Sequence, residues 1–283
     1  MYYLHKMNRE FKPTVLVLGT INLSIYSLLG SLLYLSYTKL LNNIKTYIGV
    51  SISSIYSLLL ACGYEPYEIA TDNAILNIIN NLINSMNLTM LFRDSCLLQN
   101  KPIRDYLNSR IKSKFGMIPT FKQLYEMRNV EFVSVTVNIT NNTTEYLSRD
   151  NYPNMSIVDG CIMSLSFPLL MEKFIYNGCV YIDGSFGNPY PIDYMDDNNV
   201  QILGIVVNNQ KYKDGLLDYI LTCFNYTSNE IRKRIIENSS PKCLNIVLDN
   251  SEGIPEEVMM KSINQTKLLL HNYIKNNTEC INE

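Results

Sequence analysis

The sequence predicts an α/β protein with a largely parallel sheet. Two strand–turn–helix units follow one another near the start of the chain: apolar runs at residues 15–18 and 45–50 each lead into a helical pattern. An apolar run without polar alternation is typical of a strand covered on both faces. The carboxyl ends of such parallel strands meet at one edge of the sheet, where ligands bind in α/β proteins. We therefore expect functional residues just after these two strands.

The rest of the chain continues this alternation of helices and strands. Apolar residues at helical spacing predict seven helices, the last opened by Pro-Glu-Glu, over residues 25–41, 54–62, 68–87, 102–115, 120–127, 157–163 and 255–275. Extended apolar runs predict further strands over residues 131–140, 144–148, 179–183, 200–207 and 243–248. The Asn141-Asn142 turn predicts that the first two of these form a hairpin.

We expect residues 1–283 to form a single domain, since neither a linker nor an internal repeat interrupts the pattern. The motifs discussed below occupy residues 15–207, and the strand and helix over residues 243–275 would complete the domain. The net charge of −2 provides no global basic field, which argues against a nucleic-acid partner. The seven cysteines are scattered without a C-x-x-C pair, so we expect neither a metal site nor a disulfide framework. We recognise no signal peptide and therefore expect a cytoplasmic location.

Residues 14–38 contain no charged side chain and are long enough to cross a membrane. Polar residues such as Asn22 and Ser24 interrupt this segment, and Gly19 divides it into a β-like and a helix-like half. This pattern favours a buried strand that leads into a buried helix. A membrane-anchored structural protein remains the alternative, and contact of the predicted helix with a bilayer is left open.

A candidate nucleophile lies at the end of the second strand, in Gly49-Val50-Ser51-Ile52-Ser53. A serine on a sharp strand-to-helix turn with small neighbours is typical of a nucleophile elbow, whose full pattern is G-x-S-x-G. Here Ser53 occupies the position of the second glycine. The fragment alone is weak evidence for catalysis, so Ser51 needs support from a base elsewhere in the chain.

The chain offers two histidines and one well-placed aspartate as that base. His5 precedes the first strand without structured context, and His271 falls in the middle of the last predicted helix. A catalytic histidine usually lies on a loop after a strand, so an ordinary Ser-His-Asp site is disfavoured. Asp183 ends a predicted strand before Gly184-Ser185, where it either activates the serine or only forms the turn.

Several separated motifs together resemble those of the patatin-like phospholipase family. They are the serine elbow at Gly49–Ser53, T-F-x-x-L-Y at Thr120–Tyr125, S-x-x-x-P at Ser164–Pro168, and Asp183-Gly184-Ser185 followed by Asn188 and Pro191-Ile192-Asp193. Their order and spacing agree with the family over residues 15–207.

The resemblance implies a three-layer α/β/α patatin-like fold with a mostly parallel central sheet, and a Ser-Asp dyad that cleaves acyl esters of lipids. Ser51 would be the nucleophile and Asp183 would take its proton. Water would hydrolyse the acyl-enzyme without a metal or organic cofactor. The implied partner is a lipid or phospholipid substrate, with peripheral membrane contact, and protein partners are left open. The supporting positions of the motifs are Gly49, Ser53, Gly184, Ser185 and Asn188.

The family's glycine-rich loop, whose backbone N–H groups form the oxyanion hole, differs in this chain. The corresponding stretch is Gly19-Thr20-Ile21-Asn22, and Ser24 replaces the family's basic residue. Because β-branched Thr20 and Ile21 resist positive φ, we expect this loop to be impaired. Two interpretations follow: a working lipid acyl hydrolase, or a catalytically impaired patatin-fold protein that binds lipid or a protein partner.

Overall fold

The computed structural model describes residues 11–84, 96–197, 199–208 and 216–279. The chain divides into two compact units, one formed by residues 1–45 and 190–283 and the other by residues 46–189. The first unit thus combines the two ends of the chain, and the second is its continuous middle. The prediction of a single domain stays a prediction.

The strands of the first unit are parallel, in the order β10-β9-β1. Their bounds are Val15–Leu18 for β1, Ile202–Val207 for β9 and Cys243–Leu248 for β10. Every residue of β1 and β9 is buried, as the apolar runs predict. The predicted strands at residues 15–18 and 243–248 are confirmed, and the strand predicted at 200–207 begins two residues later.

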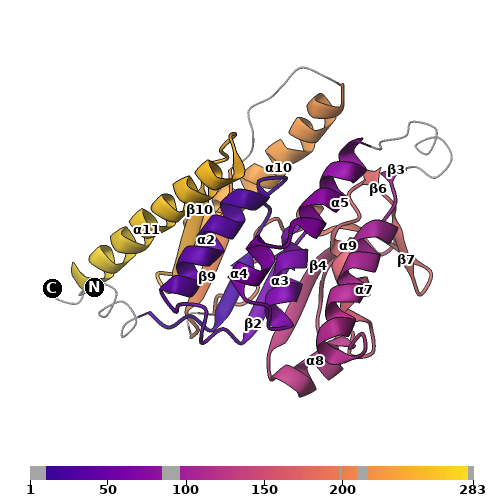
Figure 1. The fold of residues 1–283 in the computed structure, drawn as a ribbon, viewed down its shortest axis with the longest axis horizontal. Helices are drawn as coiled ribbons and strands as arrows, with labels where there is room; N and C mark the ends of the chain where they lie inside the picture. Colours follow the sequence, from indigo (N-terminus) through magenta and orange to yellow (C-terminus); the bar gives the residue numbers. More distant parts are fainter. Residues whose placement is uncertain (1–10, 85–95, 198, 209–215, 280–283) are drawn as a thin grey trace. The chain divides into compact units, whose positions relative to one another are not determined.

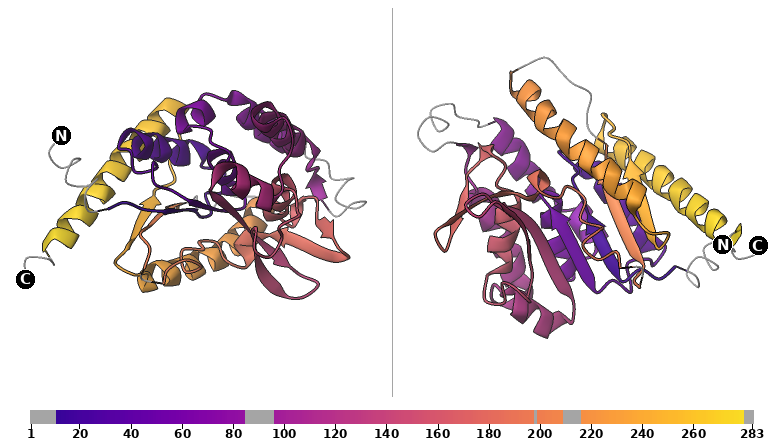
Figure 2. Two further views of the ribbon diagram at one scale, coloured as in Figure 1. Left: turned by 90° about the horizontal axis from the view of Figure 1, so that it is seen from below. Right: turned by 180° about the vertical axis from the view of Figure 1, so that it is seen from behind.

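Helices cover both faces of these three strands (Figure 2). Helices α2 (Ile25–Tyr37) and α11 (Pro255–Glu279) pack together along one face (Figure 1), and α10 (Leu216–Asn238) lies on the other. A β-carbon on Gly30 of α2 would lie 2.4 Å from the carbonyl oxygen of Met259, so this close approach requires glycine. The sequence analysis missed α10.

Helix α2 ends four residues before the predicted boundary at residue 41. Lys39 has a left-handed φ of 62°, and the N–H of Leu40 donates to the carbonyl of Leu35 at 3.0 Å. This is the hydrogen bonding of a Schellman-type helix end, with lysine in the position usually taken by glycine. The apolar pattern continues past this point because Leu40 remains buried.

The strands of the second unit are mostly antiparallel, in the order β2-β4-β8-β7. In this order β2 and β4 pair in parallel and the other neighbours pair antiparallel, and β5 forms the predicted hairpin with β4. Their bounds are Thr46–Val50 for β2, Glu131–Asn138 for β4, Thr143–Leu147 for β5, Phe174–Tyr176 for β7 and Cys179–Asp183 for β8. Strands β3 (Cys96–Leu98) and β6 (Leu169–Met171) form a separate parallel pair. The sequence analysis missed β3, β6 and β7, because three residues are too few to show a period.

Six helices in the described part of the second unit bury apolar side chains. They are α3 (Ser53–Ala61), α4 (Pro66–Ala70), α5 (Asn73–Asn84), α7 (Lys101–Phe115), α8 (Phe121–Arg128) and α9 (Ile157–Ser164). Helices α3 and α9 pack on β4 (Figure 1). These two helices and β4 surround the candidate site.

The single helix predicted over residues 68–87 is wrong, because the structure has two helices, α4 and α5, in this region. Thr71 Oγ1 donates to the carbonyl of Tyr67 at 2.8 Å, and Asp72 Oδ1 accepts from the N–H of Ala74 at 3.0 Å. Such side-chain bonds compete with the helical ladder and favour a new helix start. Residues 85–87 lie outside the described residues.

The uncharged segment at residues 14–38 forms β1, a short loop and α2, as expected for a buried strand that leads into a buried helix. Both Thr20 and Ser24 are buried within the unit. Across the described residues, every helix is too short or too polar to cross a bilayer.

Candidate active site

Ser51 lies on the sharp turn between β2 and α3. Its φ of 56° is left-handed, a conformation that non-glycine residues rarely adopt. The N–H of Ser54 donates to the carbonyl of Ser51 at 2.9 Å, which closes the first turn of α3. Strained backbone of this kind is typical of functional sites. The predicted strand-to-helix elbow is therefore present.

The small residues around Ser51 allow this turn. A β-carbon on Gly49 would lie 2.5 Å from the α-carbon of Ser54, so any other residue would separate the strand from the helix. Ser53 fits where the family has glycine, because its hydroxyl turns back to the strand. Its Oγ donates to the carbonyl of Val50 at 2.7 Å and accepts from the N–H of the same residue at 3.2 Å. The serine thus ties the helix start to the end of β2.

The structure brings Ser51 and Asp183 together although 132 residues separate them in the sequence. The Ser51 hydroxyl donates to Asp183 Oδ2 at 2.5 Å. Asp183 is the last residue of β8 and pairs with Thr136 of the central strand β4, which also pairs with β2. The order β2-β4-β8 therefore places the ends of two non-adjacent strands beside one another. The two predicted catalytic residues are in direct contact.

The carboxylate of Asp183 is fully buried. Burial raises the pKa of Asp183 from its ordinary 3.8 to about 6, and hydrogen bonds from Ser51 and Ser185 oppose this shift. The N–H of Ser185 donates to Asp183 Oδ1 at 2.8 Å. One carboxylate oxygen is thus held by the main chain, and the other receives the Ser51 hydroxyl. At neutral pH the group is largely ionised and can accept a proton.

The turn after Asp183 is held by Asn188, which is buried. The N–H of Asn188 donates to the carbonyl of Gly184 at 3.0 Å, and its Nδ2 donates to the hydroxyl of Tyr146 at 2.9 Å. Tyr146 belongs to β5, so Asn188 joins the turn to the hairpin of the same unit. These two contacts of Asn188 support the turn that follows Asp183.

Ser164, to which the sequence analysis assigned no role, contacts Ser51 directly. Its Oγ accepts a hydrogen bond from the backbone N–H of Ser51 at 2.9 Å. The only sequence signal for this contact was the position of Ser164 at the start of the S-x-x-x-P motif. A motif shows that a residue type recurs, but not which backbone group it binds.

The loop after β1, with Gly19, Thr20, Ile21 and Asn22, belongs to the first unit. The N–H of Gly19 donates to the carbonyl of Ile205 at 2.9 Å, and the Ile21 side chain is buried. Only Asn22 of these four residues has a positive φ, of 51°. Thr20 and Ile21 thus avoid the conformation that β-branched residues resist, and it falls on asparagine, which tolerates it better. That the loop forms an oxyanion hole stays a prediction.

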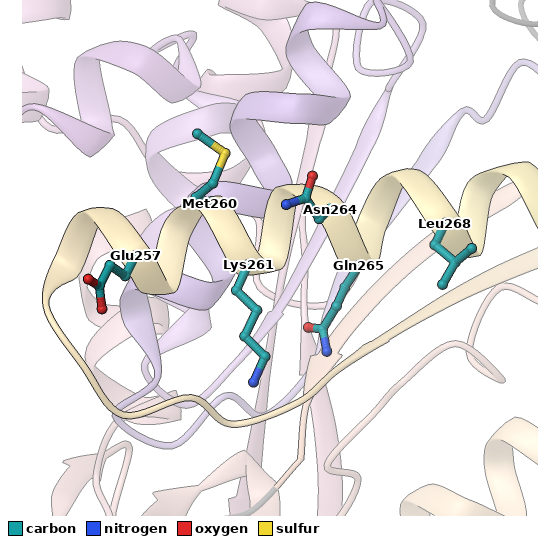
Figure 3. A pocket seen from close by; sticks show the side chains of 6 residues that line it. All are labelled: Glu257, Met260, Lys261, Asn264, Gln265 and Leu268. Atoms are coloured by element: carbon teal, nitrogen blue, oxygen red, sulfur yellow. The ribbon is translucent and has the colours of Figure 1, made fainter.

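Other candidate features of the described chain belong to the first unit. His271 is exposed on α11, and His5 lies outside the described residues. Within the described part of the chain, no group of three or more His, Cys, Asp or Glu side chains could hold a metal ion. A hollow of about 510 Å³ lies along α11, and Figure 3 shows its lining. Its lining residues are Glu257, Met260, Lys261, Asn264, Gln265 and Leu268, none of which is a predicted site residue.

Comparisons with known proteins agree with this architecture. The family model described as patatin-like phospholipase matches residues 21–196. A probable lipid hydrolase, 463L, of Invertebrate iridescent virus 6 is 29% identical over 197 residues, which are 68% of this chain and 66% of that protein. The uncharacterized protein R571 of Acanthamoeba polyphaga mimivirus is 27% identical over 203 residues, which are 65% of this chain and 62% of that protein. The matches thus span just under two thirds of these relatives.

Solved structures share the fold at low sequence identity. VipD from Legionella pneumophila has a TM-score of 0.57 at 13% identity, over 93% of this chain and 67% of that one. ExoU from Pseudomonas aeruginosa, solved as a heterodimer with SpcU, has a TM-score of 0.55 at 13% identity, over 94% of this chain and 52% of that one. The predicted three-layer α/β/α fold class is confirmed. The chain belongs to the patatin-like phospholipase family.

Proposed function

We propose that this protein is a lipid acyl hydrolase in which Ser51 is the nucleophile and Asp183 is the general base. The observation that carries the proposal is the hydrogen bond of 2.5 Å from the Ser51 hydroxyl to the buried carboxylate of Asp183. Family membership and the name of the viral relative support a lipid ester as the substrate. A soluble ester or a lipid presented at a membrane surface could each supply the acyl group.

The reaction would begin when Asp183 takes the proton of the Ser51 hydroxyl as Oγ attacks the ester carbonyl carbon. The tetrahedral intermediate then breaks its bond to the alcohol oxygen, and the alcohol leaves with the proton from Asp183. Water next attacks the acyl-enzyme and gives its proton to Asp183. The fatty acid departs as the proton returns to Ser51.

The raised pKa of Asp183 suits this role. A carboxylate with a pKa near 6 is a stronger base than an ordinary aspartate and is still largely ionised at neutral pH. Because the same side chain receives the main-chain bond from Ser185, its orientation toward Ser51 is fixed. The family's oxyanion loop corresponds to residues 19–22. Because the N–H of Gly19 already donates to Ile205, the N–H groups of residues 20–22 are the proposed donors to the developing oxyanion.

The test is fatty acid release from a short-chain ester and a panel of phospholipids. Wild type is compared with Ser51→Ala and Asp183→Asn, and with His271→Gln as a matched control that removes the alternative base. We expect activity in wild type and in the control, and a fall of at least about a thousandfold in the two site variants. Retention of activity by Ser51→Ala would refute the proposal.

Inactivity of folded wild type on the whole panel would instead favour the second interpretation. That interpretation, a protein that binds lipid without turnover, is motivated by the replacement of the family's basic loop residue by Ser24. Binding of phospholipid vesicles by the inactive wild type would support it.

A further inference from the structure

We propose that Ser164 is a positioning residue that holds the backbone of the nucleophile in its left-handed conformation. The inference rests on the proposed function, in which Ser51 is the nucleophile. Ser164 is fully buried at the last position of α9, and its Oγ accepts from the N–H of Ser51 at 2.9 Å. A side chain of α9, distant in the sequence, thus binds the backbone of Ser51, the residue with the left-handed φ.

The contact satisfies a group that the elbow would otherwise leave without an acceptor. In a sharp strand-to-helix turn, the N–H of the turning residue is directed away from both the sheet ladder and the helix. A buried N–H without an acceptor is costly, and a left-handed serine is also unfavourable. The Ser164 hydroxyl accepts the N–H of Ser51 and so removes the cost of a buried group without an acceptor. It thereby stabilises the left-handed conformation of Ser51.

The chain that turns out of the end of α9, over residues 164–166, also binds the backbone of Asp183. The carbonyl of Ser166 accepts from the N–H of Asp183 at 3.0 Å, and the Ser166 hydroxyl donates to the carbonyl of Ile162 at 3.0 Å. Two positions of one turn therefore bind the main chains of both proposed catalytic residues. This arrangement fixes the distance between Ser51 and Asp183 independently of the hydrogen bond that joins their side chains.

The central strand β4 also contacts this turn, through the side chain of Thr136. Thr136 of β4 is buried, and its Oγ1 donates to the carbonyl of Ile182 at 2.8 Å, next to Asp183. Its Oγ1 also lies 3.5 Å from the carbonyl of Met163, next to Ser164. The Thr136 side chain thus contacts both the end of α9 and the end of β8. Loss of the Ser164 hydroxyl should therefore free the Ser51 backbone while the rest of the turn stays in place.

The experiment compares Ser164→Ala and Ser164→Cys with the matched control Ser148→Ala. Ser148 is equally small and buried, and its hydroxyl bonds to Asn151, away from Ser51. We expect kcat of Ser164→Ala to fall at least about tenfold with KM unchanged. The substitution would misplace the nucleophile but leave substrate binding intact. Cysteine retains a weak acceptor and should give an intermediate kcat. The control should match wild type.

A second readout is independent of activity: the exchange rate of the Ser51 amide proton, measured by NMR. It should rise in Ser164→Ala and stay unchanged in Ser148→Ala. The inference is overturned if this rate is the same in wild type and Ser164→Ala, or if the control loses as much kcat as Ser164→Ala. If wild type hydrolyses no ester, the proposed function fails, and the amide exchange alone decides whether Ser164 holds the elbow.

Discussion

The α-carbon of Gly184 lies against the main chain of Val135 on the neighbouring strand. A β-carbon at this position would be 2.1 Å from the Val135 carbonyl oxygen and 2.6 Å from its carbonyl carbon. Because the obstacle is backbone of the central strand, a rotamer change cannot relieve it. Gly184 therefore sets how closely the turn that carries Asp183 can approach β4.

Gly184→Ala should therefore reduce both stability and ester hydrolysis. We expect a loss of about 1–3 kcal/mol in the free energy of unfolding, typical of overpacking, measured by urea denaturation. The loss of ester hydrolysis should exceed the loss of folded protein, because Asp183 must shift with the turn. Gly116→Ala is the control: Gly116 has a φ of 74° but nothing within 4 Å of an added β-carbon. It should lose stability and keep its activity, and an equal loss of activity in both variants would contradict this explanation.

Hydrolysis should depend on pH through the ionisation of Asp183. Burial raises the pKa of this carboxyl to about 6. Only the ionised form accepts the serine proton, so kcat/KM should rise through about pH 6 and level off above it. The measurement is kcat/KM between about pH 4 and pH 8 in wild type and in His271→Gln. Because an ordinary histidine titrates near about pH 6.5, an acid limb that disappears in His271→Gln would assign the base to histidine instead.

The same shift predicts that Asp183 destabilises the folded protein at neutral pH. The folded-state pKa, about 6, lies above the ordinary value of 3.8, so the folded state binds more protons between these values. The contribution of Asp183 to stability is therefore present below about pH 4 and is lost as the pH rises through about 6. Asp183→Asn should be more stable than wild type above about pH 6, by up to about 3 kcal/mol, and similar to it near about pH 4. Urea denaturation at the two pH values tests this, and a variant less stable than wild type at neutral pH would refute it.

Asn22 should tolerate glycine but not a β-branched residue. Its φ of 51° is left-handed, and this conformation costs about 1–2 kcal/mol for most side chains. We expect Asn22→Gly to keep both stability and hydrolysis, and Asn22→Val to lose both. Leu23→Val is the control, because the neighbouring Leu23 is exposed and has no positive φ. If Asn22→Val lost stability but hydrolysed esters at the wild-type rate, the loop would have no part in catalysis.

Much of the fold could be predicted from local patterns. The strands at residues 15–18 and 243–248 follow from uninterrupted apolar runs, and the elbow at Ser51 follows from small residues between a strand and a helix. The break between α4 and α5 escaped prediction because the polar side chains of Thr71 and Asp72 interrupt an otherwise continuous apolar period. Strands of three residues, such as β7, carry too little pattern to be recognised.

The sequence by itself determined most of the longer elements and which two side chains are candidates for the chemistry of a hydrolase, because periodicity and residue type act locally. The tertiary structure decided that Ser51 and Asp183 touch, that burial shifts the pKa of Asp183, and that Ser164 binds the backbone of Ser51. It also put the left-handed residue of the β1 loop at Asn22 rather than at Thr20 or Ile21. These relationships depend on strand order and packing between distant segments, which no local pattern encodes.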